Sequence, residues 1–127
     1  MQTDPRRNLG EFGERLACEH LRARGFEILE RNFRTGRGEL DVVARDDRFL
    51  VFCEVKTRIL SHEPGPLGPF AAIGPRKRRR VRLMARRWLA ARSVPPPHPP
   101  EMRFDAIGIQ LDPCGRLVGL DHLEDAF

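Results

Sequence analysis

Hydrophobic residues recur along this chain with two different spacings, one typical of helices and one typical of strands. Over residues 10–24, a helical wheel gathers charged side chains on one side and spreads apolar ones, such as Phe12, Leu16 and Leu21, over the rest. This pattern predicts an amphipathic helix. Gly25 follows it, and glycine is the residue that most readily adopts the left-handed turn beyond a helix. We therefore expect the helix to end there, and residues 1–9 to form a flexible N-terminus.

Three predicted strands come next. Short apolar runs at residues 26–33, 39–44 and 49–57 are separated by residues that favour turns. Gly36 and Gly38 mark the first turn, and Asp46 with Asp47 marks the second. Because turns this short join antiparallel neighbours, the pattern predicts a three-stranded meander.

The second half of the chain predicts one helix and one or two further strands. Residues 60–75 are rich in Gly and Pro and predict a loop, and residues 93–100 predict a stiff, Pro-rich connector. Between them, Val81, Met84, Ala85 and Trp88 recur at helical spacing, so residues 75–92 predict a helix with a buried stripe. Residues 102–111 predict a fourth strand, and residues 116–120 predict a short edge strand.

Together these elements predict one α/β domain over residues 1–127. A chain of 127 residues can build one hydrophobic core but not two independent ones. The second helix makes a crossover between the third and fourth strands, which allows those two strands to lie parallel. We therefore expect an αβββαβ order with a mixed central sheet flanked by helices.

Two of these strands carry acidic residues among their apolar ones. Side chains alternate along a strand, so Leu40, Val42 and Ala44 are expected on one face. If the purely apolar faces of the second and third strands pack on the same side, Asp41, Glu54 and Lys56 converge on the opposite face.

A buried group of carboxylates needs a compensating cation. An isolated buried carboxylate costs several kcal/mol, and Lys56 supplies only one positive charge. Glu14 of the first helix flanks the face expected to meet the sheet and adds a third acid. A divalent ion such as Mg²⁺ or Mn²⁺ takes oxygen ligands and would neutralise such a site. The alternative is an ordinary cross-strand ion pair on a wet face, and Glu39, the first residue of its strand, could equally reach solvent.

The positive charge of the chain is concentrated in the second predicted helix. The formal net charge is +5, from 23 Lys and Arg against 18 Asp and Glu. Nine of the 23 basic residues and no acid lie between residues 76 and 92, so the other 14 are outnumbered by acids. This polarity favours contact with a phosphate backbone over a merely solvated basic face. The residues expected on the outer face are Arg78, Arg79, Arg82 and Arg86.

Lys77 differs from these arginines because it shares the inward stripe of Val81, one helical turn away. It could reach a phosphate at an active site. The chain has no Tyr, so stacking on unpaired bases is poorly supported, and backbone contact with DNA fits better. Trp88 is expected in the core.

The sequence argues against several other features, namely disulfides, a zinc site, a membrane-spanning helix and a secretion signal. The three cysteines and four histidines are scattered, which argues against a disulfide framework and against zinc. No stretch approaches the roughly 18 apolar residues of a spanning helix, and the first residues lack the apolar segment of a secretion signal. These features favour a cytoplasmic protein without a membrane partner.

Several motifs resemble a known family. The segments GEFGE, RNFRTGRGELD, FCEVKTR, PRKRRRVRLMA and RFD extend from Gly10 to Asp105 and resemble the YraN-like bacterial family. At the acids, the chain is similar to the PD-(D/E)XK nuclease superfamily, whose signature is an acid on the second strand and an acid-x-Lys on the third. Asp41 matches the first, and Glu54, Val55 and Lys56 match the second. Glu14 matches the helix acid of some members, including archaeal Holliday-junction resolvases.

The resemblance implies a restriction-endonuclease-like fold and Mg²⁺- or Mn²⁺-dependent cleavage of DNA, including branched or damaged intermediates. Metal ligands would be Asp41, Glu54, the carbonyl of Val55 and Glu14, and Lys56 would act on the attacking water or the developing charge. A binding module that keeps the fold but cleaves nothing remains an alternative, as does docking on RNA. Resolvase-like relatives act as dimers, so the resemblance is compatible with a homodimer, although no residue of the sequence marks an interface. Asp105 of RFD is expected to pair with a nearby arginine.

Overall fold

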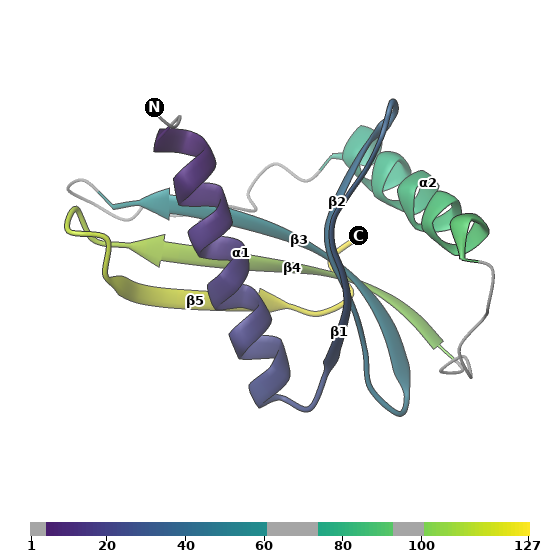
Figure 1. Cartoon of the computed structure of the whole chain (residues 1–127), viewed down its shortest axis with the longest axis horizontal. Coiled ribbons are helices and arrows are strands. Elements are labelled where there is room, and N and C mark those ends of the chain that lie inside the picture. The colour runs from purple at the N-terminus through teal and green to yellow at the C-terminus, as the bar shows by residue number, and fades with distance from the viewer. Residues whose placement is uncertain (1–4, 61–73, 93–100) are drawn as a thin grey trace.

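The structure is a computed structural model, and it describes residues 5–60, 74–92 and 101–127. Five strands form one mixed sheet in the order β1-β2-β3-β4-β5 (Figure 1). The first three, β1 (Glu27–Thr35), β2 (Gly38–Arg45) and β3 (Phe49–Ile59), make the predicted antiparallel meander. As predicted, β4 (Glu101–Leu111) lies parallel to β3. The strand β5 (Leu117–Leu123) pairs antiparallel with β4 and is longer than predicted. The prediction of a mixed α/β sheet is confirmed.

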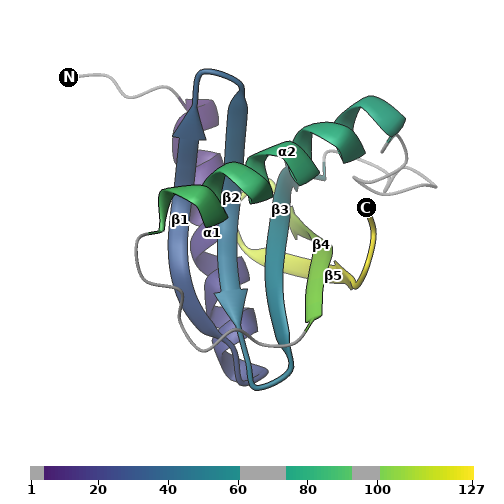
Figure 2. The same cartoon turned by 90° about the vertical axis from the view of Figure 1, so that its right-hand side faces the viewer.

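The two helices cover opposite faces of this sheet (Figure 2). Helix α1 (Pro5–Ala23) packs on one face, where Leu21 joins Val42 and Ile107 in one buried hydrophobic cluster. Helix α2 (Pro75–Ala91) packs on the other face, where Trp88 meets Phe52 at a ring-centroid distance of 5.8 Å. The stripe predicted from helical spacing, which includes Trp88, is buried. The sheet therefore has a hydrophobic core layer on each of its two faces.

Helix α1 begins earlier than the sequence pattern suggested. Residues 1–9 were expected to be flexible, but the helix starts at Pro5, so for residues 5–9 that expectation is wrong. Leu9 explains the extension, because it precedes Phe12 and Leu16 at helical spacing and packs on the same core. The predicted end is confirmed, since Gly25 has a φ of 93° just beyond the last turn.

A buried polar cluster joins β4, β5 and α1. Asp105 is fully buried and accepts two hydrogen bonds of 2.9 Å from the guanidinium of Arg103, as its predicted pairing required. His122 of β5 lies 2.8 Å from the same carboxylate, and its other ring nitrogen lies 3.0 Å from His20 of α1. Burial alone would raise the pKa of Asp105, but the hydrogen bonds from His122 and Arg103 outweigh it and hold that pKa below its usual range.

Some predictions fall outside the part of the chain that the structure describes. These are the Gly/Pro-rich loop at 60–75, apart from its ends, the connector at 93–100 and residues 1–4 of the N-terminus. Within the described residues, neither helix is both long and apolar enough to cross a membrane.

Candidate active site between the two helices

The backbone opens between β2 and β3 where the candidate acids lie. The two strands pair only from Val42 with Cys53 to Arg45 with Leu50, although both continue beyond. Where the pairing stops, the carboxylate of Asp41 takes the place of a backbone partner. Its Oδ2 accepts a hydrogen bond of 2.8 Å from the N–H of Val55. Asp41 is thus fixed in the opening by the chain itself.

This opening breaks the predicted alternation of β2. Leu40 was expected on the face of Val42 and Ala44, and that expectation is wrong: Leu40 packs in the core under α2, while Val42 packs in the core under α1. Leu40 still pairs with Phe33 of β1, and Phe33 packs against the same α2-side core. Once β2 leaves β3, it follows β1 and α2, so its faces no longer match those of β3.

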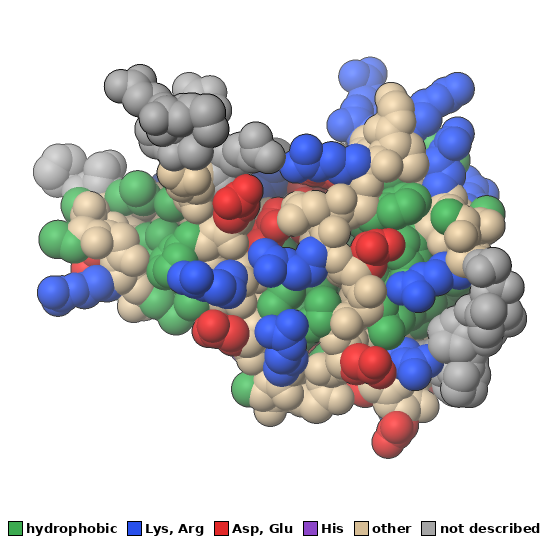
Figure 3. Space-filling model, in the orientation of Figure 1, with side chains coloured by type: hydrophobic (Ala, Val, Ile, Leu, Met, Phe, Trp, Pro, Cys, Tyr) green, Lys and Arg blue, Asp and Glu red, His purple; other side chains and the backbone are tan. Residues whose placement is uncertain are grey.

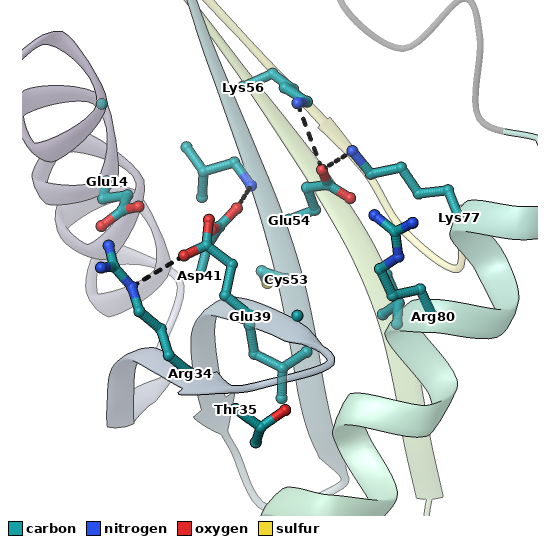
Figure 4. A pocket seen from close by; sticks show the side chains of 15 residues that line it. Glu14, Arg34, Thr35, Glu39, Asp41, Cys53, Glu54, Lys56, Lys77 and Arg80 are labelled. Atoms are coloured by element: carbon teal, nitrogen blue, oxygen red, sulfur yellow. Dashed lines mark hydrogen bonds and ion pairs between the residues drawn. The ribbon is translucent and has the colours of Figure 1, made fainter. Parts of the chain in front are cut away.

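A cavity of about 580 Å³ occupies the space between α1, the separated strands and the first turns of α2. Figure 4 shows Glu14 approaching from α1, Asp41 and Glu54 from the two strands, and Lys77 and Arg80 from α2. The cavity therefore brings together residues from five elements, α1, β1, β2, β3 and α2. Its charged lining residues are Glu14, Arg34, Glu39, Asp41, Glu54, Lys56, Lys77 and Arg80.

Glu14 is largely withdrawn from solvent, with 13% of its side chain exposed. The nearest cation is Arg31, whose Nη2 lies 3.9 Å from Oε2, too far for a hydrogen bond, and among the described residues Oε2 has no hydrogen-bond partner. Burial raises the pKa of Glu14, and a hydrogen bond from Asn32 with the charge of Arg31 only partly offsets this.

Asp41 is the most strongly perturbed acid of the cavity. Burial raises its pKa to about 7, and the N–H of Val55 pulls in the opposite direction. The negative charges of Glu14 and Glu54 also contribute to this raised pKa. An acid with a pKa near neutrality in a cleft is a common feature of functional sites.

Glu54 holds two lysines with one of its oxygens. Its Oε1 forms ion pairs with Lys77 of α2 and, at 3.7 Å, with Lys56. Its other oxygen, Oε2, is buried and has no hydrogen-bond partner among the described residues. Lys56 is half exposed, whereas 14% of the Glu54 side chain is exposed. Glu54 is therefore partly neutralised and partly free to accept another cation.

The three acids share the cavity wall but do not form a finished metal site. Within the described residues, no group of three or more His, Cys, Asp or Glu side chains is arranged to hold a metal ion. Nevertheless, among the described residues the Oε2 atoms of Glu14 and Glu54 are buried without a hydrogen-bond partner, and the pKa of Asp41 is raised, so these acids are incompletely compensated. A hard divalent cation suits such oxygen donors, provided that Glu54 turns from its lysines.

Helix α2 presents its basic residues beside this cavity. Figure 3 shows Lys and Arg side chains gathered at the end of the molecule where α2 lies. Arg78, Arg79 and Arg86 are exposed, and they have no ion-pair partner among the described residues. Arg82 is different, because its Nη2 donates a hydrogen bond of 2.9 Å to the carbonyl of Phe127. Its guanidinium also lies over the ring of Phe104 in the core.

The sequence pattern missed two cations of the cavity. Arg80 precedes Met84 by four residues, so the helical spacing that placed Lys77 inward could also have identified Arg80. Arg34 of β1 carried no such signal. It forms an ion pair of 3.1 Å with Glu39, and more than half of each side chain is exposed, so Glu39 reaches solvent at the rim of the cavity.

A family comparison covers this whole region. Residues 13–109 match the model described as "Uncharacterised protein family UPF0102". The chain belongs to the UPF0102 family. It is 48% identical to a UPF0102 protein of Parafrankia sp. over 120 aligned residues. The aligned segment covers 94% of this chain and 95% of the relative. The matched segment of this UPF0102 protein includes Glu14, Asp41, Glu54, Lys56 and Lys77.

Two further UPF0102 relatives come from other bacteria. A protein of Streptomyces griseus is 46% identical over 101 residues, covering 80% of this chain and 81% of the relative. A protein of Geotalea daltonii is 42% identical over 122 residues, covering 95% and 90%. The resemblance to the YraN-like bacterial family is confirmed.

Proposed function

We propose that this UPF0102 protein is a metal-dependent nuclease with a restriction-endonuclease-like core of the PD-(D/E)XK type, hydrolysing phosphodiester bonds in DNA. The observation that carries the proposal is the position of Asp41, inserted between β2 and β3 and bonded to the N–H of Val55. A strand pair that gives up part of its ladder to hold a half-buried carboxylate loses stability, and such losses are typical of functional sites. Glu54 and Lys56 lie in the same opening.

The residues that would hold a divalent cation are Asp41, Glu54, Glu14 and the carbonyl of Val55. Because the N–H and C=O of one strand residue point the same way, the carbonyl of Val55 faces the opening where β2 has left. Mg²⁺ or Mn²⁺, when bound, supplies Lewis-acid activation of water and neutralises charge on the phosphate. The Oε2 atoms of Glu14 and Glu54 have no hydrogen-bond partner among the described residues, which supports this assignment.

Lys56 would serve the reaction directly. It is half exposed at the mouth of the cavity, where its ammonium can orient a water or meet the negative charge that develops on the attacked phosphate. An arginine at this position would keep the charge but would replace a compact ammonium with a planar group of different geometry.

The substrate would be held through its backbone. Arg78, Arg79 and Arg86 of α2 are exposed and have no acidic partner among the described residues. Unpaired arginines on one helix face suit phosphates at the surface of a duplex or a branched DNA.

One observation favours a second candidate, a nucleic-acid-binding module that does not cleave. Glu54 is already paired with Lys56 and Lys77, and the described residues hold no ready set of metal ligands. In that case the acids would serve only to position the lysines.

Cleavage assays separate the two functions. Linear, nicked and branched DNA are incubated with the protein and Mg²⁺ or Mn²⁺, and the same assays are run with Asp41→Asn, Lys56→Met and Glu14→Gln. Glu19→Gln, an exposed acid on the same helix as Glu14, is the matched control. The nuclease proposal expects cleavage by wild type and control, and none by the three variants. Absence of cleavage by wild type, or equal cleavage by all, rejects it.

A further inference from the structure

We propose that Lys77 is an exchangeable counter-ion: it neutralises Glu54 while the cavity lacks a divalent cation and moves to a substrate phosphate once a cation takes its place. The inference rests on the nuclease function proposed above and assigns a positioning role to a residue outside the acid-x-Lys motif. Its consequence is that metal and nucleic acid each strengthen the binding of the other.

The first support is the contact itself. Lys77 forms an ion pair with Oε1 of Glu54, and the same oxygen also attracts Lys56 from 3.7 Å. Two ammonium groups crowd one oxygen while Oε2 of Glu54 stays without a partner in the described residues. A cation bound by both oxygens would satisfy Glu54 and repel both lysines.

The second support is the place of Lys77 on its helix. It lies in the first turn of α2, which begins at Pro75, has no acidic residue and has no side-chain cap from Gly74. The free N–H groups and the helix dipole at this end favour an anion. A phosphate that entered the cavity would meet both the end of α2 and the ammonium of Lys77, whose side chain is 35% exposed and flexible.

The charges of the cavity explain why the exchange needs both ligands. The four acids that line it, Glu14, Glu39, Asp41 and Glu54, face the four cations Arg34, Lys56, Lys77 and Arg80. A divalent cation alone adds two positive charges to this set, whereas a phosphodiester brings one negative charge back. Binding of the pair is therefore electrostatically easier than binding of the cation alone, and such coupling is reciprocal.

Titration calorimetry with Mn²⁺ tests the exchange without any turnover. The proteins are the full chain and the variants Lys77→Met, Asp41→Asn and Arg87→Met; Arg87 is an exposed residue of the same helix that lies outside the cavity lining. Freed from its competitor, Glu54 should bind Mn²⁺ roughly two- to fivefold more tightly in Lys77→Met, with wild-type affinity in Arg87→Met. Circular dichroism confirms that each variant is folded.

A second measurement follows the other half of the exchange. The affinity for a phosphorothioate duplex, which resists hydrolysis, is measured by fluorescence anisotropy with and without Mn²⁺. We expect Mn²⁺ to increase the affinity of wild type and Arg87→Met, and most of this gain to disappear in Lys77→Met. Unchanged or weaker Mn²⁺ binding by Lys77→Met, or an undiminished gain, overturns the role of Lys77. If wild type does not bind Mn²⁺, or if Asp41→Asn binds it as well as wild type does, the metal-dependent function itself is rejected. The proposed exchange is then rejected with it.

Discussion

Gly13 of α1 lies against Thr57 of β3 so closely that a methyl group on Gly13 would overlap the Thr57 side chain. This contact sets the distance between the helix and the sheet one residue before Glu14 and one residue after Lys56. Glycine is therefore required here by packing, since its helical backbone would accept any residue.

Gly13→Ala should lower the stability of the protein and move Glu14 away from the cavity. Overpacking of this kind typically costs about 1–3 kcal/mol, more than the gain in helix propensity. Urea denaturation measures the change. Gly10→Ala is the matched control, because a methyl group at Gly10 would meet nothing within 4 Å and should be neutral or stabilising. Equal stabilities for the two variants would contradict the close approach.

Asp41→Asn should increase stability at neutral pH and flatten its pH dependence. Folded Asp41 keeps its proton up to a pH of about 7, its raised pKa, whereas the unfolded residue loses it near 3.8. Between these values the folded state binds more protons, so the free energy of unfolding falls as pH rises, and the full cost remains above pH 7. Each pKa unit corresponds to about 1.4 kcal/mol. Asparagine cannot ionise, so it avoids this cost, and its amide oxygen can still accept the hydrogen bond from the N–H of Val55.

Urea denaturation between pH 4 and pH 8 measures this difference. Asp47→Asn removes a carboxylate from the exposed turn between β2 and β3 and serves as the control. The stability gain of Asp41→Asn over wild type should grow with pH and level off above neutrality. A gain that does not change with pH would show that Asp41 is ionised throughout the range.

Asp105→Asn should be strongly destabilising even though it lies outside the cavity. The substitution leaves Arg103, of which 11% of the side chain is exposed, without its bidentate partner, and it removes the carboxylate beside His122. Breaking one member of a buried ion pair typically costs about 3–5 kcal/mol. Chemical denaturation at pH 7 measures the loss, with the exposed Asp121→Asn of β5 for comparison. A loss below about 1 kcal/mol would mean that the cluster is readily hydrated.

Replacing three arginines of α2 by glutamine should weaken DNA binding in a salt-dependent way. The slope of log affinity against log salt should become shallower by about 0.9 on duplex DNA for each phosphate that Arg78, Arg79 or Arg86 no longer neutralises. The control replaces Arg22, Arg37 and Arg116, which are also exposed, and removes the same charge from other surfaces. Equal slopes for both triple variants would show that only net charge matters.

Local patterning was sufficient for most of the fold. The spacing of Val81, Met84 and Trp88 predicted the buried stripe of α2, and Gly25 predicted the end of α1. The turn before β3 was also correctly placed, with Asp46 accepting hydrogen bonds from the N–H groups of Arg48 and Phe49. These features depend on neighbours within a few residues, so the sequence contains all the necessary information.

The candidate site was only partly predictable. Alternation placed Asp41 and Glu54 on one face, but it assumed that β2 and β3 stay paired, and Leu40 shows that they do not. The pairing of Lys77 with Glu54 and the approach of Gly13 to Thr57 join residues more than 20 positions apart. No local pattern specifies which of many charged residues will meet.

The sequence by itself determined the order of the elements, the buried stripes and the concentration of basic residues on α2, because these follow from periodicity and composition. Only the tertiary structure decided that β2 leaves β3 at Asp41 and that Lys77 neutralises Glu54. It also decided that Oε2 of Glu14 and of Glu54 finds no hydrogen-bond partner in the described part of the chain. The physical reason is that the charge state of a buried acid depends on which side chains the packing of helices and sheet brings within a few ångströms, and that distance is a property of the whole fold.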